Sequence, residues 1–441
     1  MYTTYASTLW QTREMPTSEP YLVPGFRVTD HTVAVPLDHA DPSGPTIDVF
    51  AREVTAIDRA YDDLPWLVFL QGGPGSPSPR PASGAGDAWL AAATEHHRVL
   101  LLDQRGTGRS TPISARTIAG RSDAELAAYL RHFRADSIVA DCEALRREVA
   151  GGERWFTLGQ SYGGFCTMTY LSQAPDGLLG CYVTGGLPGL TATAEDVYAR
   201  TFPRVAAKSA GFYARYPADA AVIRAIADHL DAEDVRLPDG DRLTTRRFRV
   251  LGSFFGMSDA YERLHWLLDG AWHGDGLSDG FLHQVMGYTG FVDSPLFPMQ
   301  EYTYGQPGSG PTAWAAQRAI EQRPEFAEDA DPLLFTGETM FPWMFEEIAS
   351  LRPFRGAADL LASYDEWSPL FDLDRLAANE VPVSAVVYFD DMYVDAALSL
   401  ETADRVGNVR AWVTNEYEHD GLRADPARVL GRLRDRLLGP A

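Results

Sequence analysis

Residues 155–166 of the chain read WFTLGQSYGGFC. Three of the first four are large and apolar, as expected of a buried parallel strand, and residues 165–172 have the character of a helix. Between these segments, GQSYG at 159–163 fits the pattern G-x-S-x-G. In this pattern the serine occupies a cramped strand-to-helix turn, and the following backbone N–H can face a developing oxyanion. A surface loop would also fit the bare pattern, but the two flanking elements favour Ser161 as a nucleophile.

Two further apolar runs precede this one. They are LPWLVFL at 64–70, which ends in a glycine turn, and RVLLL at 98–102, which ends at Asp103. Residues 136–149 space their apolar side chains as an amphipathic helix does. Strands that alternate with helices predict an α/β fold with a doubly wound, mostly parallel sheet.

The pattern changes at about residue 191. Helical segments at 218–230 and 261–268 are joined by Gly/Pro-rich turns, and strand character returns only at 381–389 and 411–414. The simplest organisation is one sheet interrupted by a helical insertion. We therefore expect residues 1–190 and 373–441 to form the two parts of the core, and residues 191–372 to form a mainly helical cap.

Composition and charge limit the functional classes. The chain has 441 residues, of which 45% are hydrophobic and 11% aromatic, and this excludes disordered, collagenous and coiled-coil proteins. A net charge of −23 disfavours nucleic acid and anionic membranes as partners. Lys208 is the only lysine, so Schiff-base chemistry would depend on it, and no motif supports that role.

The cysteines and the N-terminal residues indicate the compartment. Cys142, Cys166 and Cys181 form neither a CxxC pair nor a zinc-binding spacing, which suits a reducing environment. The first residues have no secretory pattern, and no apolar run approaches the ~20 residues of a membrane helix. We expect a cytoplasmic protein.

Two glycine-rich turns follow the apolar runs. QGGPG at 71–75 allows the close backbone approach that an oxyanion hole requires, although an ordinary turn would look the same. DQRGTGRS at 103–110 lacks the lysine of a phosphate-binding loop, so we expect a structural turn braced by a pair between Asp103 and Arg105.

A serine nucleophile needs a base and an acid. In α/β hydrolases these follow in the order serine, acid, histidine, each at the carboxyl end of a strand. Of the ten histidines, only His419 lies beyond the returning strands. The acid would come from the cluster that follows residues 381–389, where spacing does not distinguish Asp390, Asp391 and Asp395.

Five ordered motifs between residues 64 and 425 together resemble the prolyl aminopeptidases (proline iminopeptidases) of the α/β-hydrolase superfamily, in their longer bacterial form. The motifs are LQGGPGSPSPRP, LLDQRGTGRS, GQSYGGFC, YFDDMYVD and NEYEHDGLR. The resemblance implies Ser161 as nucleophile, His419 as general base and Asp391 as acid. It also implies an oxyanion hole from the Gly73 region and the Tyr162 N–H. Many shorter members carry histidine where this chain has Gln71, a departure that leaves the backbone donors in place.

The resemblance also implies acidic cap residues that hold the free amino group of a peptide substrate. By resemblance these are Glu301 and Glu338, and both lie in segments rich in apolar and aromatic residues. Tyr304, Phe341 and Trp343 are candidates to line a pocket for proline, with core packing as the alternative.

The implied activity is release of N-terminal proline through a prolyl-enzyme, with no metal or organic cofactor. The alternatives are another α/β hydrolase, such as an esterase, an amidase or a tripeptide-releasing aminopeptidase, and a non-catalytic binding scaffold. The oligomeric state stays open.

Overall fold

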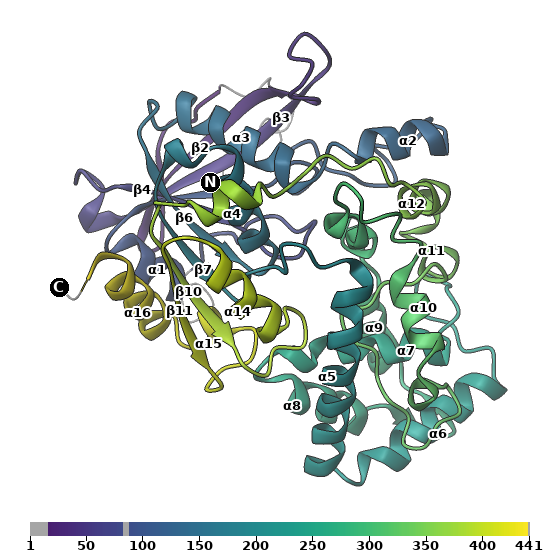
Figure 1. The fold of residues 1–441 in the computed structure, drawn as a ribbon. Coiled ribbons are helices and arrows are strands. Elements are labelled where there is room, and N and C mark those ends of the chain that lie inside the picture. The colour runs from purple at the N-terminus through teal and green to yellow at the C-terminus, as the bar shows by residue number, and fades with distance from the viewer. Residues whose placement is uncertain (1–15, 83–87, 440–441) are drawn as a thin grey trace, which may run out of the picture.

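The computed structural model describes residues 16–82 and 88–439 of the chain (Figure 1). In these residues one nine-stranded sheet has the order β1-β2-β3-β5-β4-β6-β7-β10-β11. The strands from β5 to β11 along this order are parallel, whereas β1, β2 and β3 are antiparallel to their neighbours. The strands are β1 (Tyr21–Val23), β2 (Phe26–Pro36), β3 (Thr46–Ala56), β4 (Trp66–Leu70), β5 (Arg98–Leu102), β6 (Trp155–Gln160), β7 (Leu178–Thr184), β10 (Val383–Tyr388) and β11 (Val409–Thr414).

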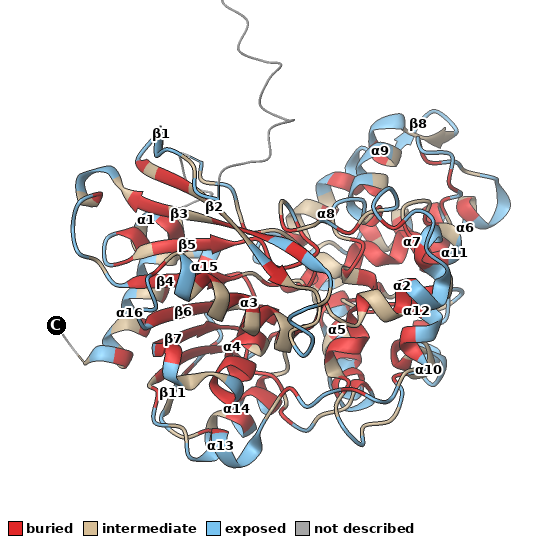
Figure 2. Cartoon of the chain, turned by 90° about the horizontal axis from the view of Figure 1, so that it is seen from above, coloured by how far each residue is buried: buried red, intermediate tan, exposed pale blue. Residues whose placement is uncertain are grey.

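The apolar runs of the sequence form the middle of this sheet. Every residue of β4 and β10 is buried, as Figure 2 shows for the central strands in red. Such strands are buried on both faces because helices cover the sheet on each side. The predicted α/β fold with a doubly wound, mostly parallel sheet is therefore confirmed.

Helices cover both faces of the sheet. On one face, side chains of α3, α4, α13 and α14 share a hydrophobic cluster with the strands, and on the other face α1 and α16 do so. These helices, with the short α15, are α1 (Ala88–Thr94), α3 (Ala135–Glu148), α4 (Tyr162–Gln173), α13 (Leu373–Ala377), α14 (Ala396–Arg405), α15 (Gly421–Ala424) and α16 (Pro426–Leu438).

Residues 191–372, here termed the cap segment, lie between β7 and β10 and run beside the sheet, coloured teal to green in Figure 1. Their helices are α5 (Ala194–Arg215), α6 (Asp219–Ala232), α7 (Thr245–Arg249), α8 (Ala260–Asp269), α9 (Asp279–Thr289), α10 (Ala315–Glu321), α11 (Met344–Glu347) and α12 (Arg355–Ala362). The segment also contains four 3₁₀ segments, Val250–Gly256, Phe297–Tyr304, Pro324–Phe326 and Arg352–Phe354, and the two-residue strands β8 (Trp272–His273) and β9 (Gly276–Leu277).

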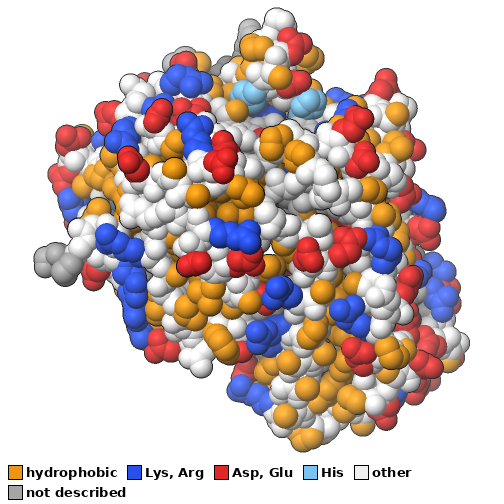
Figure 3. Space-filling model, viewed as in Figure 1, with side chains coloured by type: hydrophobic (Ala, Val, Ile, Leu, Met, Phe, Trp, Pro, Cys, Tyr) orange, Lys and Arg blue, Asp and Glu red, His pale blue; other side chains and the backbone are white. Residues whose placement is uncertain are grey.

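The cap segment has a hydrophobic cluster of its own. An earlier helix, α2 (Asp123–Leu130), contributes Leu126 and Leu130 to that cluster and packs against α12. The surface over both parts carries interspersed acidic and basic side chains on the face drawn in Figure 3. Among the described residues, no helix combines the length and apolar character required to cross a lipid bilayer.

Candidate active site

Ser161 stands at the turn between β6 and α4. Its backbone has φ 55° and ψ −123°, a conformation that is costly for a residue with a side chain and is concentrated at functional sites. The turn is held by the Ser161 N–H, which donates to the Thr184 carbonyl at 3.0 Å. A Cβ atom at Gly163 would lie 1.8 Å from the Leu70 carbonyl oxygen, so only glycine fits there. Ser161 itself keeps partial contact with solvent.

His419 and Asp391 form a buried pair. The Nδ1 atom of His419 lies 2.6 Å from Oδ2 of Asp391, and the two residues are 4% and 2% exposed. The other carboxylate oxygen of Asp391 accepts hydrogen bonds from the N–H groups of Tyr393 at 2.8 Å and Val394 at 3.1 Å. The carboxylate is thereby fixed in the orientation that a histidine partner needs.

The structure separates the three candidate aspartates. Asp391 alone pairs with His419, whereas Asp390 lies 3.2 Å from Arg204 and Asp395 accepts hydrogen bonds from the first N–H groups of α14. Ser161 follows β6, and the Asp391–His419 pair lies on the loops after β10 and β11. Because β6, β7, β10 and β11 are adjacent and parallel, these loops lie at the same edge of the sheet.

Two glycines after β7 lie between Ser161 and His419. A Cβ atom at Gly185 would lie 3.0 Å from His419 Nδ1, and one at Gly186 would lie 2.4 Å from the Ser161 carbonyl oxygen. Between the described residues Ser161 and His419 there is no side-chain hydrogen bond. Such contacts often tighten only when substrate binds. The catalytic roles of these residues stay predictions.

The charge of His419 is set by opposing effects. Burial lowers the pKa of its imidazole, but the ion pair and hydrogen bond with Asp391, together with Glu338 and Asp420, raise it further than burial lowers it. The net pKa is above the ordinary value of histidine. The imidazole therefore loses its proton, and becomes able to accept another, only at a higher pH than a free histidine.

The loop after β4 runs close to Ser161. A Cβ atom at Gly72 would lie 2.8 Å from the Ser161 Cβ atom, so the backbone leading into Gly73 passes within van der Waals distance of the serine. Tyr162 is the first residue of α4, where a backbone N–H has no partner within the helix. The oxyanion-hole role of Gly73 and Tyr162 stays a prediction.

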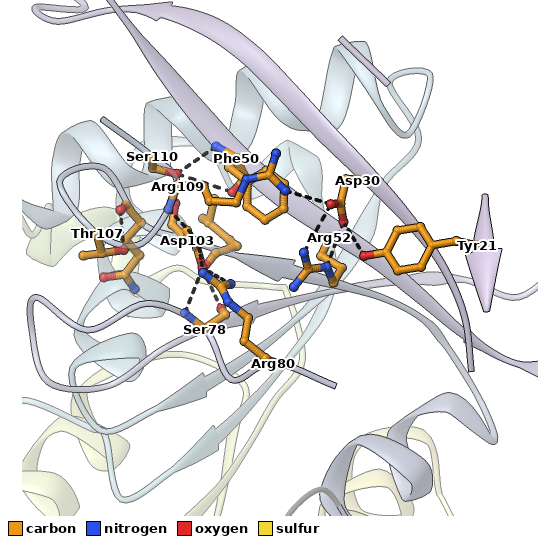
Figure 4. Close-up of polar contacts among 12 residues, drawn as sticks. Tyr21, Asp30, Phe50, Arg52, Ser78, Arg80, Asp103, Thr107, Arg109 and Ser110 are labelled. Carbon is orange, nitrogen blue, oxygen red and sulfur yellow. Dashed lines mark hydrogen bonds and ion pairs between the residues drawn. The ribbon is translucent and has the colours of Figure 1, made fainter. Parts of the chain in front are cut away.

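Asp103 braces this loop, as Figure 4 shows. Its buried carboxylate accepts two hydrogen bonds from Arg80, both at 2.7 Å, and one from the Ser78 N–H at 3.1 Å. On the other side it accepts the Arg109 N–H at 2.9 Å. The following residue, Gln104, donates from Nε2 to the Gln71 carbonyl at 3.0 Å. The turn at 103–110 thus supports the loop that contains Gly72 and Gly73.

The predicted pair between Asp103 and Arg105 is wrong. Arg105 binds Asp141 of α3 through two hydrogen bonds, at 2.6 and 2.7 Å. The two side chains of the turn take opposite directions, Asp103 toward the loop after β4 and Arg105 toward α3. Asp103 pairs with the exposed Arg80 and Arg105 with the buried Asp141, and the sequence of the turn alone does not distinguish these partners.

Glu301 is buried in the cap segment, with 4% of its surface exposed. Its two carboxylate oxygens accept the N–H groups of Ala315 at 3.0 Å and Ala316 at 2.9 Å, at the start of α10. Burial raises the pKa of this carboxyl to about 7, although these hydrogen bonds oppose the rise. Glu301 therefore holds the start of α10 through these two hydrogen bonds. Its carboxylate is nevertheless costly to ionise, because it is buried.

Glu338, in the cap segment, lies next to the loop that contains Asp391. A Cβ atom at its neighbour Gly337 would lie 3.0 Å from the Met392 side chain. Burial raises the pKa of Glu338 to about 7, while the nearby His419 and a hydrogen bond from Gln300 lower it less. The residue nevertheless keeps partial solvent access.

The two glutamates share a polar environment in which neither forms an ion pair with another described residue. Burial raises the pKa of Tyr198 and Tyr304, and both glutamates raise it further, so all four side chains interact electrostatically. Within the part of the chain that the structure describes, no lysine, arginine or histidine forms an ion pair with Glu301 or Glu338. Buried carboxylates ordinarily have such a partner.

The three aromatic candidates divide into two groups. The Tyr304 ring lies 6.1 Å from that of Phe165, which is on α4 near Ser161. Phe341 and Trp343 instead stack on each other at 5.9 Å, and Arg246 lies over the Trp343 ring. The structure therefore brings Tyr304 toward the serine and places the other two in packing contacts of the cap segment.

One contribution of the cap segment was missed by sequence reasoning. The carbonyl of Gly256 accepts the His419 N–H at 2.9 Å, and the Gly256 N–H donates to the Tyr393 hydroxyl at 3.2 Å. The Tyr393 ring stands edge-on to the imidazole at 4.9 Å. No local pattern in the sequence marks Gly256, because its partners are distant along the chain.

Comparisons with known proteins agree with this arrangement. Residues 65–229 match the family model described as the alpha/beta hydrolase fold. A proline iminopeptidase of Aeromonas sobria is 45% identical over 416 residues, which cover 94% of this chain and 97% of that protein. Proline iminopeptidase aneH of Aspergillus aculeatus is 33% identical, over 92% of this chain and 93% of that protein.

Among solved structures, a proline iminopeptidase of Mycobacterium smegmatis superposes with a TM-score of 0.43 at 14% identity, covering 92% of this chain and 99% of that one. This superposition is loose, so the relationship rests on the two sequence matches. On their identity and coverage, the chain belongs to the proline iminopeptidase family of α/β hydrolases.

Proposed function

We propose that this protein is a serine exopeptidase that releases N-terminal proline from peptides through a prolyl-enzyme intermediate. The observation that carries the proposal is that Glu301 and Glu338, whose pKa values burial raises, have no ion-pair partner among the residues that the structure describes and lie near the His419–Asp391 pair. A site that keeps two costly carboxylates near its base is suited to a positively charged ligand. The free α-ammonium of a peptide supplies that charge, and the family relationship supplies the reaction class.

The proposed mechanism starts with Ser161. His419 removes the hydroxyl proton as the serine oxygen attacks the carbonyl carbon of the N-terminal proline, and Asp391 stabilises the imidazolium. The N–H groups of Gly73 and Tyr162 hold the oxyanion. His419 then protonates the leaving amine of the shortened peptide. Water, activated by the same imidazole, hydrolyses the prolyl ester and frees Ser161.

The glutamates set which bond is cut. An ammonium held by Glu301 and Glu338 places the carbonyl of the first residue at Ser161, so a peptide is cleaved one residue from its N-terminus. The bound cation also favours the ionised form of both carboxylates, which burial alone disfavours. N-acetylated peptides lack this charge and are expected to be poor substrates.

The proposal is tested with p-nitroanilides of proline and alanine, each with a free and an acetylated N-terminus. The wild-type protein is expected to cleave only the free prolyl compound rapidly, and Ser161→Ala to abolish this activity. Broad cleavage that tolerates acetylation would instead indicate a general esterase or amidase. Full activity of Ser161→Ala would refute the serine mechanism.

The setting of the activity is also part of the proposal. We propose that residues 191–372 act as a cap over the site and that the protein works in the cytoplasm. The three free, buried cysteines support a reducing compartment. A net charge of −23 supports peptides rather than nucleic acids or anionic membranes as partners.

A further inference from the structure

Three basic residues on one face of α5 pair with the loops that carry Asp391 and His419. Arg200, Arg204 and Lys208 are spaced four residues apart, so they line one side of the helix. Nη1 of Arg204 lies 3.2 Å from Asp390, and Nζ of Lys208 lies 2.6 Å from both carboxylate oxygens of Glu418. Arg200 makes a longer contact of 3.8 Å with Asp395.

The two close pairs are adjacent to the proposed catalytic groups in sequence. Asp390 immediately precedes Asp391, and Glu418 immediately precedes His419. These loops follow different strands, β10 and β11, and α5 is the element that contacts both through ion pairs. Figure 1 shows α5 on the side of the cap segment that faces the yellow C-terminal part of the chain.

Lys208 is the more constrained of the two cations. The residue is only 8% exposed, and a buried ammonium is tolerated only when it is paired. Both oxygens of Glu418 meet it at 2.6 Å, and the Tyr261 hydroxyl donates to the Lys208 carbonyl at 2.7 Å. The single lysine of the chain therefore occupies the position next to the proposed base.

We propose that Lys208, assisted by Arg204, is a positioning residue for His419 and Asp391: the ion pairs of α5 hold the two loops in register and neutralise the acid next to the imidazole. This inference rests on the proposed function, since it assumes that His419 is the base. It gives the cap segment a role in the chemistry besides binding the substrate amino group.

The charges around His419 determine the sign of the effect. Asp391 faces it from the β10 loop, Glu338 from the cap segment and Asp420 from its own loop. Glu418 precedes His419 in the chain, and its carboxylate is paired with Lys208 of α5. The neighbouring rings of Tyr388 and Tyr393 are neutral. Removing Lys208 leaves Glu418 without its cation and favours the imidazolium, so the base becomes available only at higher pH.

The test is the pH dependence of prolyl p-nitroanilide cleavage. Lys208→Met is expected to lower kcat about tenfold, a loss of ~1.4 kcal/mol of transition-state stabilisation, with KM changed less than about twofold. The acidic limb of kcat/KM should move to higher pH by about half a unit. Lys208→Arg should keep most of the wild-type rate, because it preserves the ion pair.

Glu418→Gln provides a test of opposite sign. It leaves the Lys208 ammonium without its counter-charge next to the loop that carries His419, so the acidic limb should move to lower pH. The double variant Lys208→Met/Glu418→Gln should return the limb toward its wild-type position. These opposite shifts keep the inference testable even if Lys208→Met fails to fold.

Arg215→Gln is the matched control, because Arg215 lies on the same helix and pairs with Glu262 at the surface. It should leave both the rate and the pH profile unchanged. If the Lys208 and Glu418 variants change only the melting temperature, their role is structural and the inference is overturned. Retention of activity by Ser161→Ala would overturn the proposed function instead, whatever the Lys208 variants show.

Discussion

Glu338→Gln distinguishes the stability cost of burying the Glu338 carboxylate from the proposed role of that carboxylate in binding the substrate ammonium group. Glutamine keeps the size and shape of the side chain and removes its charge. Burial raises the pKa of Glu338 from 4.5 to about 7. Each pH unit between these values is worth about 1.4 kcal/mol, so ionised Glu338 costs the folded state at most about 3 kcal/mol.

The sign of this effect depends on pH. Between pH 4.5 and about 7, folded Glu338 holds a proton that the unfolded chain has released. The unfolding free energy of the wild-type protein therefore falls as pH rises through this window, and the full penalty is present above it. Glu338→Gln lacks the penalty. The variant should be more stable than wild type at pH 8, by up to about 3 kcal/mol, and little different at pH 4.5.

Urea unfolding at the two pH values measures this difference. Glu346→Gln is the control, because Glu346 pairs with Arg355 at the surface and should change stability by less than about 0.5 kcal/mol at either pH. A Glu338→Gln protein that is no more stable than wild type at pH 8 would refute the reasoning. That result would mean that Glu338 is solvated or already paired.

The activity of the same variant should move in the opposite direction. A hydrogen bond to a charged group is worth about 1.5–3 kcal/mol, so kcat/KM for free prolyl p-nitroanilide should fall by roughly 10- to 150-fold, mainly through KM. Hydrolysis of N-blocked esters should be spared. Equal loss on both substrate classes would discard the proposed contact with the ammonium group.

Three further substitutions test the geometry of the site. Gly163→Ala forces a Cβ atom into the backbone of β4 and should cost several kcal/mol, about 4 or more, in thermal unfolding, whereas Gly431→Ala on α16, where space is open, should be neutral or stabilising. Asp391→Asn should lower kcat by about 10³- to 10⁴-fold with a normal circular dichroism spectrum, and a loss below tenfold would argue against the acid role. Asp103→Asn removes the buried charge that Arg80 and two backbone N–H groups contact, and should destabilise the protein by about 1.5–3 kcal/mol. It should also lower kcat more than it raises KM, and an unchanged kcat would show that Asp103 does not influence the loop that contains Gly73.

Strands β4, β5 and β10 were predictable because burial on both faces makes their residues almost wholly apolar. These three strands lie within the runs identified in the sequence, whereas β6 continues past its run to Gln160 and β11 begins before its run, at Val409. The central strand β7 (Leu178–Thr184) was not identified, and neither were the N-terminal strands. β2 and β3 carry exposed positions and charged residues, including the Asp30–Arg52 pair between them, and such mixed strands give no continuous apolar signal.

The parts of the site that lie in one short stretch of sequence were predictable. The strand, glycines and serine around Ser161 are contiguous, and the backbone strain found there is what that pattern indicates. Distinguishing Asp391 from Asp390 required a distance to His419, because both occupy the same turn. The missed partner of Asp103 follows from the same limitation, since Arg80 and Asp103 are on different loops.

Strand order along the chain also bears on biosynthesis. Ser161 follows β6, whereas Asp391 and His419 follow β10 and β11, which come after the whole cap segment. A growing polypeptide therefore presents its serine while the proposed base has yet to be translated, and folding from the N-terminus cannot complete the site early. A chain whose translation stops within the cap segment lacks both proposed partners of Ser161. We therefore expect it not to cleave the N-termini of neighbouring nascent chains. The three proposed catalytic groups are present together only after β11, an edge strand of the sheet, and the loop that follows it have been made.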